Sequence, residues 1–107
     1  MPTLNTQQSF DDACHAIAQE IANVVIAKQH DYGHENILGF GERGLVVRLW
    51  DKISRLKNLI WVGQQPKNES VSDTFTDVAG YAIIGLMLQR DLFTLELKER
   101  YEETKAV

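Results

Sequence analysis

Apolar residues recur every three or four positions along most of this 107-residue chain, and this spacing constrains the fold more than any other feature. Two long segments, about 9–30 and 42–62, show it most clearly. Their apolar positions are Phe10, Ala13, Cys14, Ile17, Ile21, Val24 and Val25 in the first segment, and Leu45, Val46, Leu49, Trp50, Ile53, Leu56 and Ile60 in the second. Because this period matches the 3.6 residues of a helical turn, both segments are predicted to be amphipathic α-helices.

A third helix is predicted over about 70–88. Gly63 and Pro66 separate it from the second helix, as is typical of a helix stop and a loop. The helix contains Gly80 and Gly85, each of which costs about 0.5 to 1 kcal/mol relative to alanine. We therefore expect another helix to approach closely at these two glycines.

A fourth, partly exposed helix is predicted over about 91–104, where Leu92, Phe93, Leu95 and Leu97 precede a charged end. No strand pattern accompanies these helices. The predicted fold class is therefore all-α, a four-helix bundle that forms one domain over residues 1–107.

Composition excludes some classes of protein and favours others. The formal net charge of -4 argues against a protein that binds along a nucleic-acid duplex, since such binding depends on Lys and Arg. No signal peptide or membrane span is recognised, and the single Cys14 cannot form an intramolecular disulfide. We expect a cytoplasmic protein without a membrane partner, and its small size favours a homo-oligomer, a dimer or larger.

The stretch "KQHDYGHENILGFGERG", residues 28–44, is interpreted as containing a functional loop over 31–41. Tyr32 can stack on a base and Asn36 can read its edge, while Lys28 and Asp31 add charged groups. The alternative is an ordered loop that caps turns and covers the edge of the core. His30 and His34 are expected to be merely exposed. Their H-x-x-x-H spacing is that of two zinc ligands on one helix face, but Gly33 interrupts the helix and argues against a zinc site.

Acidic residues gather at the start of the third helix. Asp73 and Asp77 are four residues apart on one face, and Glu69 lies one turn earlier. Like charges at this spacing repel each other unless a cation lies between them, and Mg²⁺ is one such cation. The alternative is structural, because Ser70 and Asp73 have the spacing of a capping box.

The second helix presents a mostly cationic stripe of Arg48, Asp51, Lys52 and Arg55. By itself this stripe can be explained by a surface ion pair between Asp51 and Arg55. If it lay opposite the acids of the third helix, the two together would form a site whose acids neutralise a metal ion and whose cations neutralise phosphates. The remaining ligand-binding candidates are Asn58 and Tyr81.

Three strings, "KQHDYGHEN", "RLWDKISRLKNL" and "NESVSDTFTDVAGYAII", occur in this order within residues 20–90. Together they resemble a small family of bacterial and phage proteins labelled a nucleotide-modification-associated domain. That family is similar in helical layout to the MazG-like all-α nucleoside triphosphate pyrophosphohydrolases, which hold Mg²⁺ with acids from two helices. The resemblance implies an oligomeric, nucleotide-handling protein, and a phage source would place it in the cytoplasm of a bacterial host.

The match to the MazG-like pattern is incomplete. Asp73 and Asp77 match its second acidic element, but the E-x-x-E pair of the first element is reduced to Asp51, with Glu20 as the nearest spare acid. A site short of carboxylates and rich in cations can bind phosphates without cleaving them.

Two hypotheses follow. As a hydrolase, the protein would bind Mg²⁺ with a set of acids, and two cations would stabilise the departing phosphate. The metal ligands would be Asp73, Asp77, Asp51 and Glu69, and the catalytic residues Asp73, Asp77, Lys52 and Arg55. As a binder, it would sequester a nucleotide, such as a cyclic signal of host defence, without cleaving it.

Overall fold

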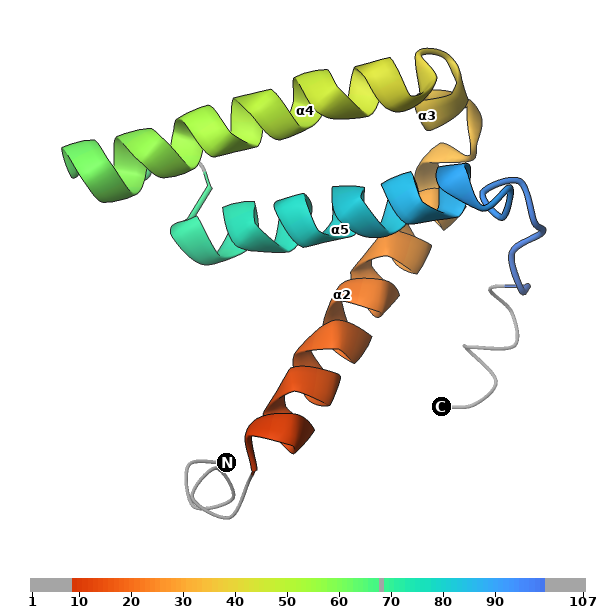
Figure 1. Ribbon diagram of the computed structural model, residues 1–107, viewed down its shortest axis with the longest axis horizontal. Helices are drawn as coiled ribbons and strands as arrows, with labels where there is room; N and C mark the ends of the chain where they lie inside the picture. Colours follow the sequence, from red (N-terminus) through yellow and green to blue (C-terminus); the bar gives the residue numbers. More distant parts are fainter. Residues whose placement is uncertain (1–8, 68, 100–107) are drawn as a thin grey trace.

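The computed structural model describes residues 9–67 and 69–99. It contains the helices α2 (Phe10–Tyr32), α3 (Glu35–Leu38), α4 (Gly41–Leu56) and α5 (Val71–Gln89), together with a π-helix, η1 (Lys57–Val62), that continues α4 (Figure 1). No strand occurs in the residues that the structure describes. The predicted all-α class and the three long helices are confirmed.

Local signals in the sequence set the ends of these helices. The Ser9 hydroxyl accepts a hydrogen bond from the backbone N–H of Asp12, which caps α2. Ser70 and Asp73 form the predicted capping box at the start of α5. Gly63, with φ of 85°, ends η1 in the left-handed conformation that glycine tolerates best.

The helices α4 and α5 lie side by side and run antiparallel, while α2 crosses α5 and its N-terminal half projects away from both (Figure 1). The two interior glycines of α5 lie at these crossings. A Cβ atom at Gly80 would lie 3.2 Å from Val25 of α2, and one at Gly85 would lie 3.8 Å from Leu45 of α4. The expected helix neighbours are therefore present at both glycines, although the nearest atoms belong to side chains.

A small core lies where α2, α3, α4 and α5 come together. Its buried apolar residues are Ile37, Leu45, Ile84 and Phe93. Val25, Tyr81, Met87 and Leu88 pack around them and are partly buried. The core thus gathers one residue from each of three helices and one from the segment that follows α5.

The predicted loop over 31–41 is largely helical. The helix α2 continues through Tyr32, and α3 occupies residues 35–38. Ile37 of α3 is buried in the core, so this stretch is held in place by an apolar anchor. The prediction that His30 and His34 are exposed is wrong, since both are half-buried. The ring of His34 packs edge-on against Phe93, with centroids 5.1 Å apart.

The predicted fourth helix is wrong in its described part, since residues 91–99 are not helical. Asp91 takes a φ of 55°, and the backbone N–H of Leu92 donates to the carbonyl of Met87, which is the pattern of a Schellman stop. The chain then turns so that Phe93 enters the core. Residues 100–104 of this prediction lie outside the described residues.

Among the described helices, α5 is long and apolar enough to cross a membrane by length and composition, a test that core helices of soluble proteins also pass. The sequence analysis recognises no such span. In the structure, α5 packs against both α4 and α2.

Candidate functional site

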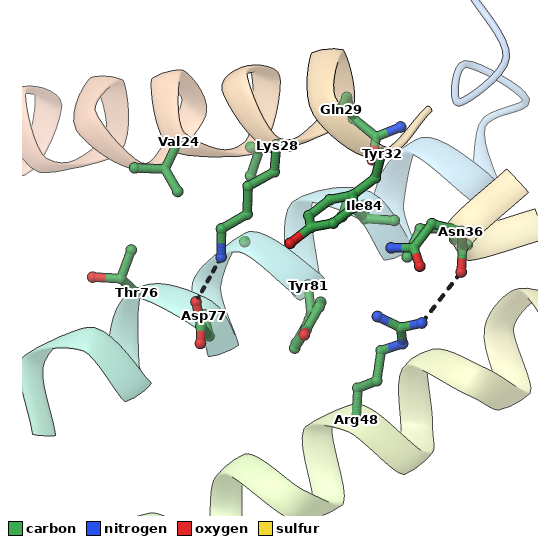
Figure 2. A pocket seen from close by; sticks show the side chains of 13 residues that line it. Val24, Lys28, Gln29, Tyr32, Asn36, Arg48, Thr76, Asp77, Tyr81 and Ile84 are labelled. Carbon is green, nitrogen blue, oxygen red and sulfur yellow. Dashed lines mark hydrogen bonds and ion pairs between the residues drawn. The ribbon is translucent and has the colours of Figure 1, made fainter. Parts of the chain in front are cut away.

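A cleft of about 290 Å³ opens between α2, α3, α4 and α5 (Figure 2). Its polar lining residues include five of the predicted ligand-binding residues and one predicted catalytic and metal-binding residue. These are Lys28, Tyr32, Asn36, Arg48 and Tyr81, and Asp77. Residues from four helices thus meet at one recess.

One end of the cleft is built from α3 and its neighbours. Arg48 of α4 donates a hydrogen bond from Nη2 to the backbone carbonyl of Asn36, 3.2 Å away, which links α4 to α3 (Figure 2). The ring of Tyr32 extends from the last turn of α2 toward the cleft and remains 66% exposed. This end therefore presents an aromatic face and an amide beside a guanidinium.

The other end of the cleft is an ion-pair network centred on Asp77. Lys28 Nζ lies 3.3 Å from Asp77 Oδ1, and Lys52 Nζ lies 2.8 Å from Asp77 Oδ2. Lys52 also contacts Glu69 Oε1 at 2.9 Å. Lys52 therefore joins the carboxylate of Glu69, just before α5, to that of Asp77 within α5, and Asp77 contacts two ammonium groups.

Glu69 is held by further contacts. The hydroxyl of Thr74, which is fully buried, donates to Glu69 Oε2 at 2.6 Å, and Arg55 Nε lies 3.7 Å from the same oxygen. The sequence analysis did not identify Thr74. The sequence feature that could have identified Thr74 is its position three residues before Asp77, on the inward side of α5, where a hydroxyl can reach a neighbouring carboxylate.

The network shifts the pKa values of its members in the direction that keeps them charged. Burial alone lowers the pKa of Lys52, but hydrogen bonds to Asp77 and Glu69 and their charges raise it above its ordinary value. Hydrogen bonds from Thr74 and Lys52 lower the pKa of Glu69. Burial raises the pKa of Asp77, yet the contacts with Lys52 and Lys28 outweigh burial and leave the pKa lowered.

A second groove of about 330 Å³ adjoins the cleft and shares two of its lining residues. It is lined by Arg48, Asp51, Lys52, Arg55 and Tyr81. The cationic stripe of α4 thus faces α5 across this groove. The expected ion pair between Asp51 and Arg55 is not the contact that Arg55 makes, since Arg55 lies near Glu69.

The remaining candidates lie elsewhere. Asn58 lines a separate groove with Gln64 and Lys67. Asp31 and Glu20 are exposed on α2 and do not line the cleft. Gln29 is a lining residue that the sequence analysis missed; it is buried and its Nε2 lies 3.0 Å from His34 Nδ1.

The four predicted metal ligands do not converge on one point. Asp73 accepts a hydrogen bond from the backbone N–H of Ser70 in the capping box, and Asp51 lies in the second groove. Glu69 and Asp77 are joined by the ammonium group of Lys52. Within the described part of the chain, no group of three or more His, Cys, Asp or Glu side chains could hold a metal ion, so Mg²⁺ stays a prediction.

The fold and the cleft together define a small all-α protein with a recess lined by cations and tyrosines. Residues 28–88, more than half of the chain, match the family model described as nucleotide modification associated domain 1. The chain belongs to this family. The matched segment includes every residue that lines the cleft except Val24 and Val25. Neither the curated proteins nor the solved structures give a match to the chain.

Proposed function

We propose that the cleft and its adjoining groove bind a nucleotide and hold it without cleaving it. The observation that carries this proposal is the meeting of an aromatic ring, an amide and several cations at one recess, inside the segment that matches the nucleotide-modification family. Protein sites for unpaired bases use these groups, because rings stack on bases and amides bind their edges.

The base would lie at the end of the cleft near α3. Tyr32 offers a largely exposed ring that can stack on a base of any kind, and Asn36 offers both a donor and an acceptor. A volume of about 290 Å³ is at the small end of ligand pockets, so the cleft suits one base with its sugar.

The phosphates would lie in the adjoining groove. Arg48 lies in both recesses and Arg55 lines the groove, and their guanidinium groups can bind phosphate oxygens in pairs. Asp77 and Glu69 repel phosphates less than free carboxylates would, because Lys28 and Lys52 are paired with them. The local charge therefore favours an anion even though the whole chain is acidic.

The carboxylates as they lie fit a metal ion poorly. The Lys52 ammonium already contacts both Glu69 and Asp77, so a divalent cation would have to displace it. This favours binding over metal-dependent hydrolysis. The alternative is the MazG-like pyrophosphohydrolase that the sequence predicts, and the experiment must distinguish this activity from binding without cleavage.

The test is to incubate the purified protein with a panel of linear and cyclic nucleotides, in Mg²⁺ or in EDTA, and to filter it. The bound fraction is then released by heat and separated by chromatography. A nucleotide that is depleted from the filtrate and recovered unchanged in both conditions supports the proposal. Release of pyrophosphate and a monophosphate, lost in the Asp77→Asn variant, would overturn it in favour of a hydrolase.

A variant pair locates the site. Tyr32→Ala removes the ring that would stack on the base, and we expect the affinity for the retained nucleotide to fall about tenfold or more by calorimetry. Phe10→Ala is the matched control, because Phe10 is also a largely exposed aromatic residue and lies at the other end of α2. Equal affinities for the two variants would place the nucleotide elsewhere.

A further inference from the structure

The rod formed by α4 and η1 carries an apolar face that points away from α5. We call it the outer α4 face; its residues are Val46, Trp50, Ile53, Ile60 and Trp61, which are between 52% and 79% exposed. Val46, Trp50 and Ile53 are spaced by four and three residues, and Ile60 and Trp61 follow about two turns later, so these residues lie toward one side of the rod. Part of this face is a groove of about 460 Å³, lined by Val46, Leu49, Trp50, Ile53, Ser54 and Lys57.

The outer α4 face is unusual for a helix in water. A surface helix normally carries one apolar stripe, which is directed at the core. Here Leu45 already meets the core on the side of α5, yet the opposite side presents two tryptophans. Contiguous apolar patches of this kind mark interaction sites.

We propose that the outer α4 face binds the same face of a second copy of this chain, with the two rods antiparallel about a two-fold axis. The groove is self-complementary for this arrangement. Its lining residues form pairs at equal distances from the middle of the rod, Val46 with Lys57, Leu49 with Ser54, and Trp50 with Ile53. An antiparallel copy therefore places Trp50 of each chain opposite Ile53 of the other, as an isologous contact requires.

The charge of the groove favours the antiparallel direction. Lys57 is the one charged residue that lines it, and its ammonium lies 6.0 Å from the ring of Trp61. Parallel rods would bring the two Lys57 ammonium groups together. Antiparallel rods place each Lys57 beside Val46 of the other chain, where its aliphatic stem covers apolar surface and its charge reaches water.

The area of the face is sufficient for a stable pair. Covering two tryptophans and three aliphatic side chains at these exposures removes on the order of 500 Å² from water in each copy. Two copies then bury on the order of 1,000 Å², which is the size that a specific interface must reach. The small core of the single chain is consistent with a fold that is completed by association.

Light scattering coupled to size-exclusion chromatography tests the proposal across a concentration series. We expect wild-type protein to have twice the mass of one chain, and Trp50→Glu to weaken dimerisation about 100-fold or more, as the loss of a central tryptophan does at interfaces. Leu95→Glu is the control, because Leu95 is similarly exposed but lies after α5. Circular dichroism verifies that each variant keeps its helices.

Charge reversal makes the test specific to a contact between like faces. Trp50→Glu and Ile53→Lys are each expected to dimerise weakly, whereas their equimolar mixture is expected to form a heterodimer, because position 50 of one chain lies opposite position 53 of the other. A wild-type protein that stays monomeric up to about 100 μM would overturn the proposal. An oligomer that folded Trp50→Glu leaves intact would overturn it as well, and would assign association to another surface.

Discussion

The two faces of α4 contrast in a way that reverses the usual pattern of a surface helix. The inner face presents Arg48, Lys52 and Arg55 toward the rest of the molecule, and each of these cations has an acceptor on α3 or at the start of α5. The outer face presents Trp50 and Ile53 to water. Polar residues thus lie inside and large apolar residues outside.

This difference shows that the apolar stripe alone does not determine how a helix is oriented. The helix α4 has apolar residues on both sides, so its orientation depends on what its polar residues can contact. Asp77 and Glu69 provide partners for Lys52, and Leu45 enters the core beside them. One face therefore contributes to the candidate site, and the other is the face that we propose for association.

The largest expected effect is the difference in the free energy of unfolding between an alanine substitution on the inner face of α4 and one on its outer face. Leu45→Ala should lower the free energy of unfolding by about 3 kcal/mol, because Leu45 is buried and its loss leaves a cavity in the small core. Ile53→Ala should change the stability of the dilute monomer by less than about 0.5 kcal/mol. Urea denaturation followed by circular dichroism measures both values.

Concentration sharpens this comparison. If the outer α4 face binds a second copy, the effect of Ile53→Ala should grow as protein concentration rises, whereas that of Leu45→Ala should not, since only association depends on concentration. Equal losses for the two variants in dilute solution would mean that the outer face is buried within one chain, and the contrast between the faces would fail.

The sequence predicts the helices well because their signals are local. Periodic apolar residues, the Ser70 capping box and Gly63 each act within one or two turns, and all three are observed. The stop at Asp91 could not be predicted in this way. There the helix ends and Phe93 enters the core, whose other residues are distant in the sequence.

The candidate site could be predicted only in part, because some of its features follow from local helical spacing and others from contacts between helices. Helical spacing was enough to align Lys52 with Arg48 and to place Asp77 on the inward side of α5. It could not show that Lys52 joins Asp77 to Glu69. That contact depends on the distance between α4 and α5, which a single sequence does not specify.

A second, smaller effect separates the lysines of the two faces. Lys52→Met removes the ammonium between Glu69 and Asp77 and should lower the free energy of unfolding by about 2 kcal/mol at neutral pH, since it leaves two partly buried carboxylates with fewer partners. Lys57→Met is the matched control on the outer face. It removes an exposed cation near Trp61 and should cost less than about 0.5 kcal/mol. A loss for Lys52→Met that is as small as the one expected for Lys57→Met, measured by urea denaturation, would show that the network at Lys52 adds nothing to stability.

The smallest expected effect is on the pH dependence of stability. The pKa values of Glu69 and Asp77 are lowered in the fold, so their contribution is complete above the unfolded values near 4 and is lost as pH falls through the folded values. The pKa of Lys52 is raised, so its contribution is present below about 10.4 and is lost as pH rises through the folded value. As far as these groups are concerned, wild-type stability should therefore be nearly constant between about pH 5 and 10 and fall on each side. In Lys52→Met the acid side should be shallower, because protonation relieves the repulsion between the two carboxylates, and the alkaline contribution of Lys52 should be absent. Urea midpoints measured from pH 3 to 11 test this, and parallel curves for wild type and variant would contradict the coupling between Lys52 and the acids of α5.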